Sequence, residues 1–110
     1  MLLNKLIFAL FYVSTVTVCF AAEPDASRQN ELVRLVRQDC GSCHGMTLQG
    51  GLGTPLTREA LADKPTDYLS AMILHGRPGT AMPPWRTLLT EAQAQWIAER
   101  LREGFPEEIR

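Results

Sequence analysis

The chain has 110 residues and a formal net charge of −1, from 11 basic and 12 acidic side chains. This length allows one domain. The absence of a basic excess argues against nucleic acid as a partner.

The chain begins with a pattern typical of a secretory signal peptide. Lys5 gives a short basic start, and a mostly apolar run over residues 6–20 is followed by two alanines. Such segments are removed from exported proteins. We predict cleavage after Ala21, so residues 1–21 form the signal peptide and residues 22–110 form one mature, exported domain. The mature chain would carry 10 basic and 12 acidic side chains, a charge of −2.

Two alternatives exist for this leader. A membrane anchor is disfavoured because about 15 apolar residues fall short of the ~20 that span a bilayer. Lipid attachment at Cys19 is disfavoured because Val18, which precedes it, is larger than the residue that processing prefers. After cleavage only Cys40 and Cys43 remain. In an oxidising compartment two bare thiols would tend to form a disulfide unless something else occupies them.

The first predicted helix covers residues 27–38 and runs into Cys40. Its apolar face consists of Leu32, Val33, Leu35 and Val36, and the arginines expected to face solvent are Arg28, Arg34 and Arg37. A glycine-rich loop follows over residues 45–57. A brief helix is then predicted around residues 58–63.

The next helix follows Pro65, which suits a first helical turn. One face of this helix carries Tyr68, Leu69, Met72 and Ile73. Gly76 ends it just past His75. Residues 76–89 contain too much proline and glycine for a helix.

The last helix begins with a capping box, in which Thr90 caps and Gln93 lies three residues on. Its apolar face holds Trp96, Ile97 and Leu101. Gly104 and Pro106 end the helix, and a frayed tail is expected. The predicted fold class is therefore all-α, with three to four short helices and long loops. So small a core is marginal, and a large apolar group held inside would explain the loops.

The stretch "DCGSCHGM", residues 39–46, carries the chemistry. The spacing C-x-x-C-H is that of c-type haem attachment. Cys40 and Cys43 lie about one helical turn apart, so both sulfurs can reach the two vinyl groups of one haem. His44 then reaches the iron from the proximal side. Gly41 and Ser42 let the backbone approach the ring closely.

Zinc and a redox-active dithiol are the alternatives for the same residues. Zinc prefers four tetrahedral ligands, and only Cys40, Cys43, His44 and His75 are available. Neighbouring Cys43 and His44 would have to converge on one ion. A thioredoxin-like dithiol needs a βαβ pattern, and no strand is predicted. Haem is favoured over both.

The stretch "GTAMPPW", residues 79–85, offers the second iron ligand. Methionine is a soft ligand that favours ferrous iron and raises the reduction potential. Pro83 and Pro84 stiffen the loop that carries Met82. His75, in the last turn of a helix, is the rival ligand, and an open sixth position is a third possibility. Met46 lies too near His44 in sequence, and Met72 is assigned to the core.

These residues together resemble the small bacterial class I c-type cytochromes. The matching pieces are the attachment motif, "GTPLT", "YLSAMILHGRPGTAMPPW" and a closing helix with Trp96, over most of residues 30–103. The resemblance implies a small class I cytochrome c fold around one covalent haem. It also implies that the carbonyl of Pro55 accepts a hydrogen bond from His44. Trp96 would pack on the first helix, while Trp85 and Arg77 would pack on the haem and pair a propionate.

A narrower likeness is to the periplasmic monohaem cytochrome encoded with the nitrite reductase that carries haem c and a d-type haem. This likeness implies an electron carrier, not an enzyme, that has no small-molecule substrate and passes electrons to the reductase. A monomer is expected, docking partners at a haem edge between residues 46–53 and 79–83. An assembly role for the d-type haem, and an open-site sensor or enzyme, are the alternative functions.

Overall fold

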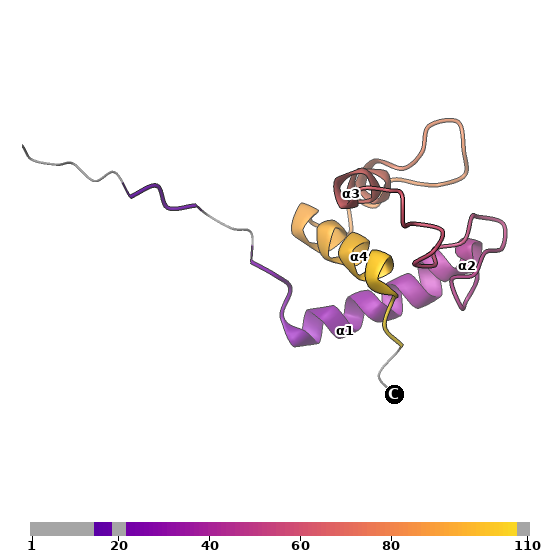
Figure 1. The fold of residues 1–110 in the computed structure, drawn as a ribbon, viewed down its shortest axis with the longest axis horizontal. Helices are drawn as coiled ribbons and strands as arrows, with labels where there is room; N and C mark the ends of the chain where they lie inside the picture. Colours follow the sequence, from indigo (N-terminus) through magenta and orange to yellow (C-terminus); the bar gives the residue numbers. More distant parts are fainter. Residues whose placement is uncertain (1–14, 19–21, 108–110) are drawn as a thin grey trace, which may run out of the picture.

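The computed structural model describes residues 15–18 and 22–107, and every regular element within them is helical (Figure 1). The elements in chain order are α1 (Ala26–Leu35), the π-helical turn η1 (Val36–Cys40), α2 (Gly41–His44), α3 (Thr66–His75) and α4 (Glu91–Glu103). The prediction of an all-α class is confirmed. No helix in the described part is both long and apolar enough to cross a membrane. Most of the predicted signal peptide lies outside the described residues.

The three helical segments α1, η1 and α2 follow one another without a break and form one rod. The rod begins at Asp25, whose side chain accepts a hydrogen bond from the Arg28 backbone N–H at 2.8 Å. Such a cap satisfies one of the free donors at a helix start. The rod ends at Gly45, whose φ of 90° suits glycine far better than other residues.

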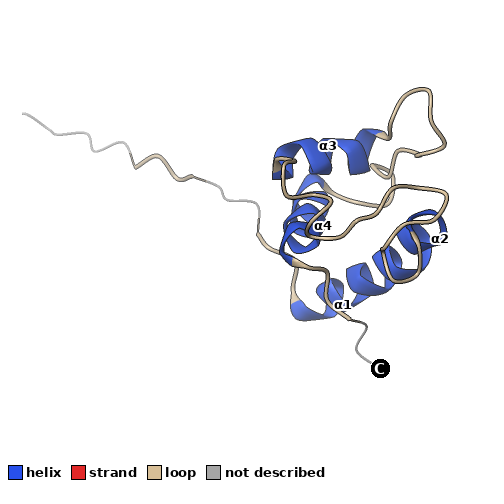
Figure 2. Ribbon diagram, turned by 45° about the vertical axis from the view of Figure 1, so that its right-hand side comes forward, coloured by secondary structure: helices blue, strands red, loops and turns tan. Residues whose placement is uncertain are grey.

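The core forms where α4 packs on α1. Leu32 and Val36 from α1 and η1 are fully buried, and Ile97 of α4 is 1% exposed. Trp96 lies in the same cluster, as expected from the sequence. Both views place α4 between α3 and the rod (Figure 2). Each fully buried aliphatic side chain here contributes about 1.5–3 kcal/mol.

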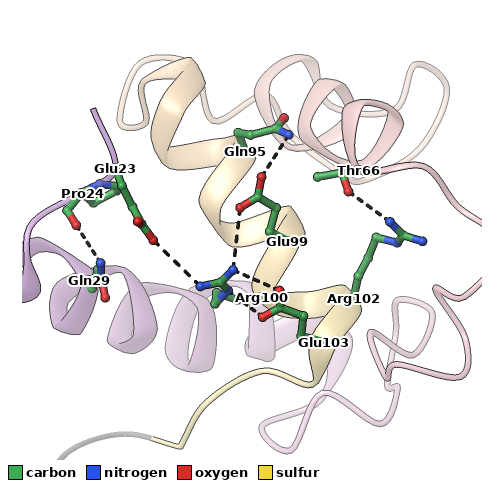
Figure 3. Close-up of polar contacts among 9 residues, drawn as sticks. All are labelled: Glu23, Pro24, Gln29, Thr66, Gln95, Glu99, Arg100, Arg102 and Glu103. Carbon is green, nitrogen blue, oxygen red and sulfur yellow. Dashed lines mark hydrogen bonds and ion pairs between the residues drawn. The ribbon is translucent and has the colours of Figure 1, made fainter. Parts of the chain in front are cut away.

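The predicted capping box of the last helix is present. Thr90 Oγ1 accepts from the Gln93 N–H at 3.2 Å, and Gln93 Oε1 accepts from the Thr90 N–H at 3.1 Å. Further along α4, Arg100 lies within ion-pair distance of Glu23, Glu99 and Glu103 (Figure 3). Arg102 donates to Thr66 Oγ1 at 3.2 Å and so connects α4 to the start of α3.

The prediction of a helix at residues 58–63 is wrong, because this segment forms a series of turns. The Leu61 N–H donates to Thr57 O, but the Lys64 N–H donates to Leu61 O, so the bonding pattern is irregular. The Ala60 N–H donates to the Thr57 hydroxyl oxygen at 3.2 Å. A segment this short gains too few hydrogen bonds to offset helix nucleation, and Pro65 disfavours helical geometry in the residue before it.

Arg37 and the C-terminal tail also differ from expectation. Arg37 was expected to face solvent, but it is only 8% exposed. Its guanidinium donates to the carbonyls of Phe105 and Pro106, at 2.9 and 3.0 Å from Nη2. The described part of the tail is therefore not frayed. A buried cation requires partners, and the backbone carbonyls beyond Gly104 supply them.

Candidate cofactor site

The end of the helical rod carries two thiols and one imidazole within five residues. Cys40 closes η1, while Cys43 and His44 lie in α2. Both cysteines are free thiols; Cys40 is half-buried and Cys43 is exposed. Burial, aided by the nearby charge of Asp39, raises the pKa of Cys40 to about 11. The Cys40 thiol is therefore protonated at neutral pH.

The loop after α2 turns back to close the end of the helix. The Gly50 N–H donates to His44 O at 2.8 Å, and the Gly53 N–H donates to Cys43 O at 2.7 Å. The last carbonyls of a helix have no partner within the helix. Here the loop supplies partners for two of them and thereby fixes its own path around the motif.

His44 is oriented by a hydrogen bond from its ring to this loop. Nδ1 of His44 lies 2.6 Å from the carbonyl oxygen of Thr54. Because a carbonyl only accepts, Nδ1 carries the proton and Nε2 keeps a lone pair for a metal. The expectation that Pro55 supplies this carbonyl is wrong by one residue. Pro55 instead restricts Thr54 to an extended conformation, which fixes the direction of the accepting carbonyl.

Gly53 lies against the imidazole of His44, a contact that the sequence did not indicate. A Cβ at position 53 would lie 2.8 Å from Nδ1 and 2.9 Å from Cε1 of His44. Any side chain there would displace the ring. The sequence predicted only that the glycines of residues 45–57 break helical structure, so the close approach of Gly53 was missed.

A second loop, residues 76–86, carries Met82. It leaves α3 at Gly76, whose φ is 70°, and a Cβ at that position would lie 2.7 Å from Met82 O. The Arg77 N–H donates to Met82 O at 3.2 Å, and the Met82 N–H donates to Thr80 Oγ1 at 3.3 Å. These contacts fold the loop back on itself and leave Met82 half-buried.

The return of this loop is anchored to the end of α3. The Trp85 N–H donates to Ile73 O at 3.0 Å, and the Arg86 N–H donates to Leu74 O at 3.2 Å. Both views place this loop and α2 at the same end of the molecule (Figures 1 and 2). The segments that carry His44 and Met82 therefore lie toward one end of the molecule, although they are far apart in the sequence.

The other candidate residues lie as follows. His75 is exposed and lines a depression between α3 and α4 together with Asp67 and Glu91. Met46 is 62% exposed in the first loop, whereas Met72 is half-buried in α3. His75 thus faces the start of α4, and the second loop carries only Met82 as a soft donor.

Trp85 and Arg77 occupy different environments. Trp85 is half-buried and packs against the hydrophobic core cluster. Arg77 is exposed, and its contacts within the described chain are made by its backbone. Their assignment as a packing partner and an anion partner of the cofactor stays a prediction.

The residues present fit a covalently held haem better than zinc. Two thiols, an imidazole with a free Nε2 and a thioether are the donors that a haem c requires. Residues 40–57 contain no aspartate, glutamate, lysine or arginine, so the surroundings of the motif suit a large apolar ring. Among the described residues, no three His, Cys, Asp or Glu side chains are grouped to hold a metal ion. The four ligands that structural zinc prefers are not brought together.

A small helical domain with this motif and these two loops defines a c-type cytochrome. Comparison with known proteins leads to the same class. Residues 27–99 match the family model described as cytochrome c oxidase, cbb3-type, subunit III. The chain belongs to this family of c-type cytochromes, which carry covalently bound haem c. The resemblance to small bacterial cytochromes is thus confirmed, and the family supports an electron carrier rather than an enzyme.

Named relatives narrow the likeness. The chain is 57% identical over 93 residues to cytochrome c55X of Paracoccus denitrificans, covering 84% of this chain and 90% of that protein. It is similar to a solved c-type cytochrome NirC, with 57% identity, a TM-score of 0.72, and coverage of 74% and 95% of the two chains. It also matches part of dihydro-heme d1 dehydrogenase NirN in complex with DHE, with 34% identity, a TM-score of 0.62, and coverage of 74% of this chain but 17% of that one.

Proposed function

We propose that this protein is a periplasmic monohaem electron carrier with histidine and methionine as iron ligands. One haem c would be attached through Cys40 and Cys43, with His44 as the proximal ligand and Met82 as the distal one. Bound in this way, haem supplies an iron that changes oxidation state without binding a substrate. The observation that carries the proposal is the orientation of His44, whose Nδ1 is engaged by Thr54 while Nε2 stays available.

The chain's own residues would hold both ligands in place. The hydrogen bond from His44 to Thr54 keeps the imidazole in one tautomer. The anchored loop holds the thioether of Met82 without a further loss of chain entropy. Rigid ligands favour electron transfer because little rearranges when the iron changes charge.

The surface around the motif supports contact with a redox partner. Leu52 is 95% exposed and Met46 is 62% exposed, within the uncharged segment 40–57. Exposed apolar side chains next to a redox centre suit a small, transient protein interface. We infer that partners dock there. The resemblance to cytochromes encoded with nitrite reductase supports that enzyme as the acceptor.

A rapid-mixing experiment tests this partner. Reduced protein is mixed with nitrite reductase, and oxidation of the haem is followed by absorbance. We expect oxidation at a rate that matches turnover of the reductase. A control with a small inorganic oxidant shows that the haem can be oxidised. Oxidation by the small oxidant but not by the reductase would remove the reductase as partner and leave the carrier function intact.

An alternative is a role in making the d-type haem of the reductase. The 34% identity to part of dihydro-heme d1 dehydrogenase NirN supports this alternative, because that protein is named for this haem. A deletion strain tests it. Reductase from the strain would lack its full content of d-type haem if the role is real, whereas a full content would contradict it.

The leader is part of the proposal. Export with cleavage after Ala21 would place residues 22–110 in the periplasm. The intact mass of the purified protein, with haem attached, tests both the cleavage site and the number of haems. A mass that retains residues 1–21 would overturn the cleavage.

A further inference from the structure

The helical rod changes its winding immediately before the haem-attachment motif. The Gly41 N–H donates to Val36 O, a bond that spans five residues rather than four. The turn Val36–Cys40 therefore accommodates one more residue than an α-helical turn would. Turns of this kind are rare and are found frequently at functional sites.

An uninterrupted α-helix would present the motif differently. At about 100° per residue, Cys43 would lie within about 20° of the direction of Leu32, which faces α4 and is fully buried. Gly41 would lie about 180° from Leu32, on the solvent side. An uninterrupted helix would thus turn the second thiol of the motif toward the side of the rod that Leu32 occupies.

The observed exposures are the reverse of that arrangement, and Met46 of the first loop lies beside Gly41. Gly41 is buried and Cys43 is exposed. One extra residue in the turn rotates everything after it by about 100° relative to α1. The apolar face of α1 keeps its contact with α4, while Cys43 turns away from the core.

Arg37 lies inside this turn and connects it to the end of the chain. Its Nη2 donates to Phe105 O and Pro106 O at 2.9 and 3.0 Å, and its Nε donates to Pro106 O at 3.2 Å. Its guanidinium carbon lies 5.6 Å from the centre of the Phe105 ring. Hydrogen bonds from a charged donor are stronger than neutral ones, and the side chain is 8% exposed. Arg37 therefore fastens η1 to the segment that follows α4.

We propose that Arg37 is a positioning residue for haem attachment. By holding η1 in its π-helical winding, Arg37 keeps Cys43 and His44 turned outward, where both sulfurs and the imidazole can serve one ring. The inference rests on the proposed attachment through Cys40 and Cys43. It adds a role for a buried arginine that lies outside the motif.

The test is where haem becomes attached in Arg37→Ala, expressed with the attachment machinery. Peptide mass mapping of the purified protein distinguishes chains linked at both cysteines from chains linked only at Cys40. We expect the ratio of doubly to singly linked chains to fall about tenfold, since a hydrogen bond from a charged group shifts an equilibrium by about that factor. Arg37→Lys should recover part of the ratio, because a lysine can donate to a carbonyl but lacks the planar fork.

Two controls separate positioning from loss of stability. Arg34→Ala removes an exposed arginine from the same rod and should behave like the wild type. Leu101→Ala removes a buried side chain of α4 from the core and leaves Arg37 and its acceptor carbonyls unchanged in the sequence. It should lower the unfolding temperature while leaving the ratio unchanged. An equal loss of double attachment in Leu101→Ala and Arg37→Ala, or a wild-type ratio in Arg37→Ala, would overturn the proposal.

Deletion of Gln38 tests the winding itself, because it removes one exposed residue from the turn. The rod should then become an uninterrupted α-helix with Cys43 toward the core, and linkage at both cysteines should be lost. Full double linkage in the deletion variant would also overturn the inference. If the wild-type protein carried no covalent haem at all, the proposed function would fail instead, so the two failures are distinguishable.

Discussion

Gly53→Ala is the sharpest test of how the proximal ligand is held. The added Cβ would lie 2.8 Å from Nδ1, 2.9 Å from Cε1 and 3.3 Å from Cγ of His44. Ordinary contact begins near 3.4 Å, so the ring or the loop must move by about 0.6 Å. The ring cannot move alone by this amount and keep its 2.6 Å hydrogen bond to Thr54.

The expected cost has two parts. Overpacking a filled contact destabilises a protein by about 1–3 kcal/mol, and weakening the His44–Thr54 hydrogen bond adds about 0.5–1.5 kcal/mol. A domain of this size loses about 4–8 °C of unfolding temperature per kcal/mol. For a total of about 1.5 kcal/mol or more, we expect Gly53→Ala to unfold at least about 6 °C below the wild type.

The spectroscopic readout is more specific than the stability. In the proposed site a displaced imidazole would alter the bond between His44 and iron, so the reduction potential and the paramagnetically shifted proton resonances of His44 should change. Gly79→Ala is the matched control, because a Cβ there meets nothing within 4 Å and only its φ of 76° is strained. It should cost about 1 kcal/mol and leave the potential unchanged. A wild-type potential and unfolding temperature in Gly53→Ala would refute the argument.

Three further predictions concern the distal ligand, the core and a helix cap. Met82→Ala should abolish the absorption band of the thioether–iron bond, lower the reduction potential and allow external ligands to bind the iron. The control Met72→Leu should leave the band, the potential and ligand binding unchanged. An unchanged spectrum in Met82→Ala would mean that Met82 is not the ligand and would make His75 the next candidate. Trp96 is 4% exposed, yet its Nε1 has no hydrogen-bond partner among the described residues. Trp96→Ala should cost about 3–5 kcal/mol, but Trp96→Phe should stay within about 1 kcal/mol because it removes an unsatisfied donor; equal losses in denaturant unfolding would contradict this. Thr90→Ala should cost about 1 kcal/mol in the same assay, and no loss would show that the capping box is not formed in solution.

Local patterns in the sequence were sufficient for most of the helices. The apolar face of the first helix, the stop at Gly76 and the box at Thr90 each depend on neighbouring residues, and all three are present in the structure. The segment at residues 58–63 was misassigned because it has helical composition but too few residues to offset nucleation. Local helix propensity therefore gave a wrong prediction where the length of the segment, rather than its residue types, decides whether a helix forms.

The site shows a different limit. The types of donor residue are predicted from the motif and its spacing, but their partners depend on how the loops fold back. Neither the acceptor carbonyl of Thr54 nor the contact of Gly53 with the imidazole follows from local sequence. The burial of Arg37 depends on residues almost seventy positions away. Such contacts arise from tertiary packing, which composition and periodicity do not encode.

The two loops of the site are held by the same kind of hydrogen bond, from a loop N–H to a carbonyl at the end of a helix. Helix α2 ends with the carbonyls of Cys43 and His44 bonded by N–H groups of the first loop, and α3 ends with the carbonyls of Ile73 and Leu74 bonded by N–H groups of the second. Carbonyls at helix ends need partners in any case, so each loop is fixed by bonds that the helix already requires. These bonds position the segments that carry His44 and Met82 in addition to the core contacts of Leu48 and Trp85. It follows that Leu101→Ala, which changes a core side chain of α4 and none of these bonds, should lower stability without shifting the potential, whereas Gly53→Ala should shift both.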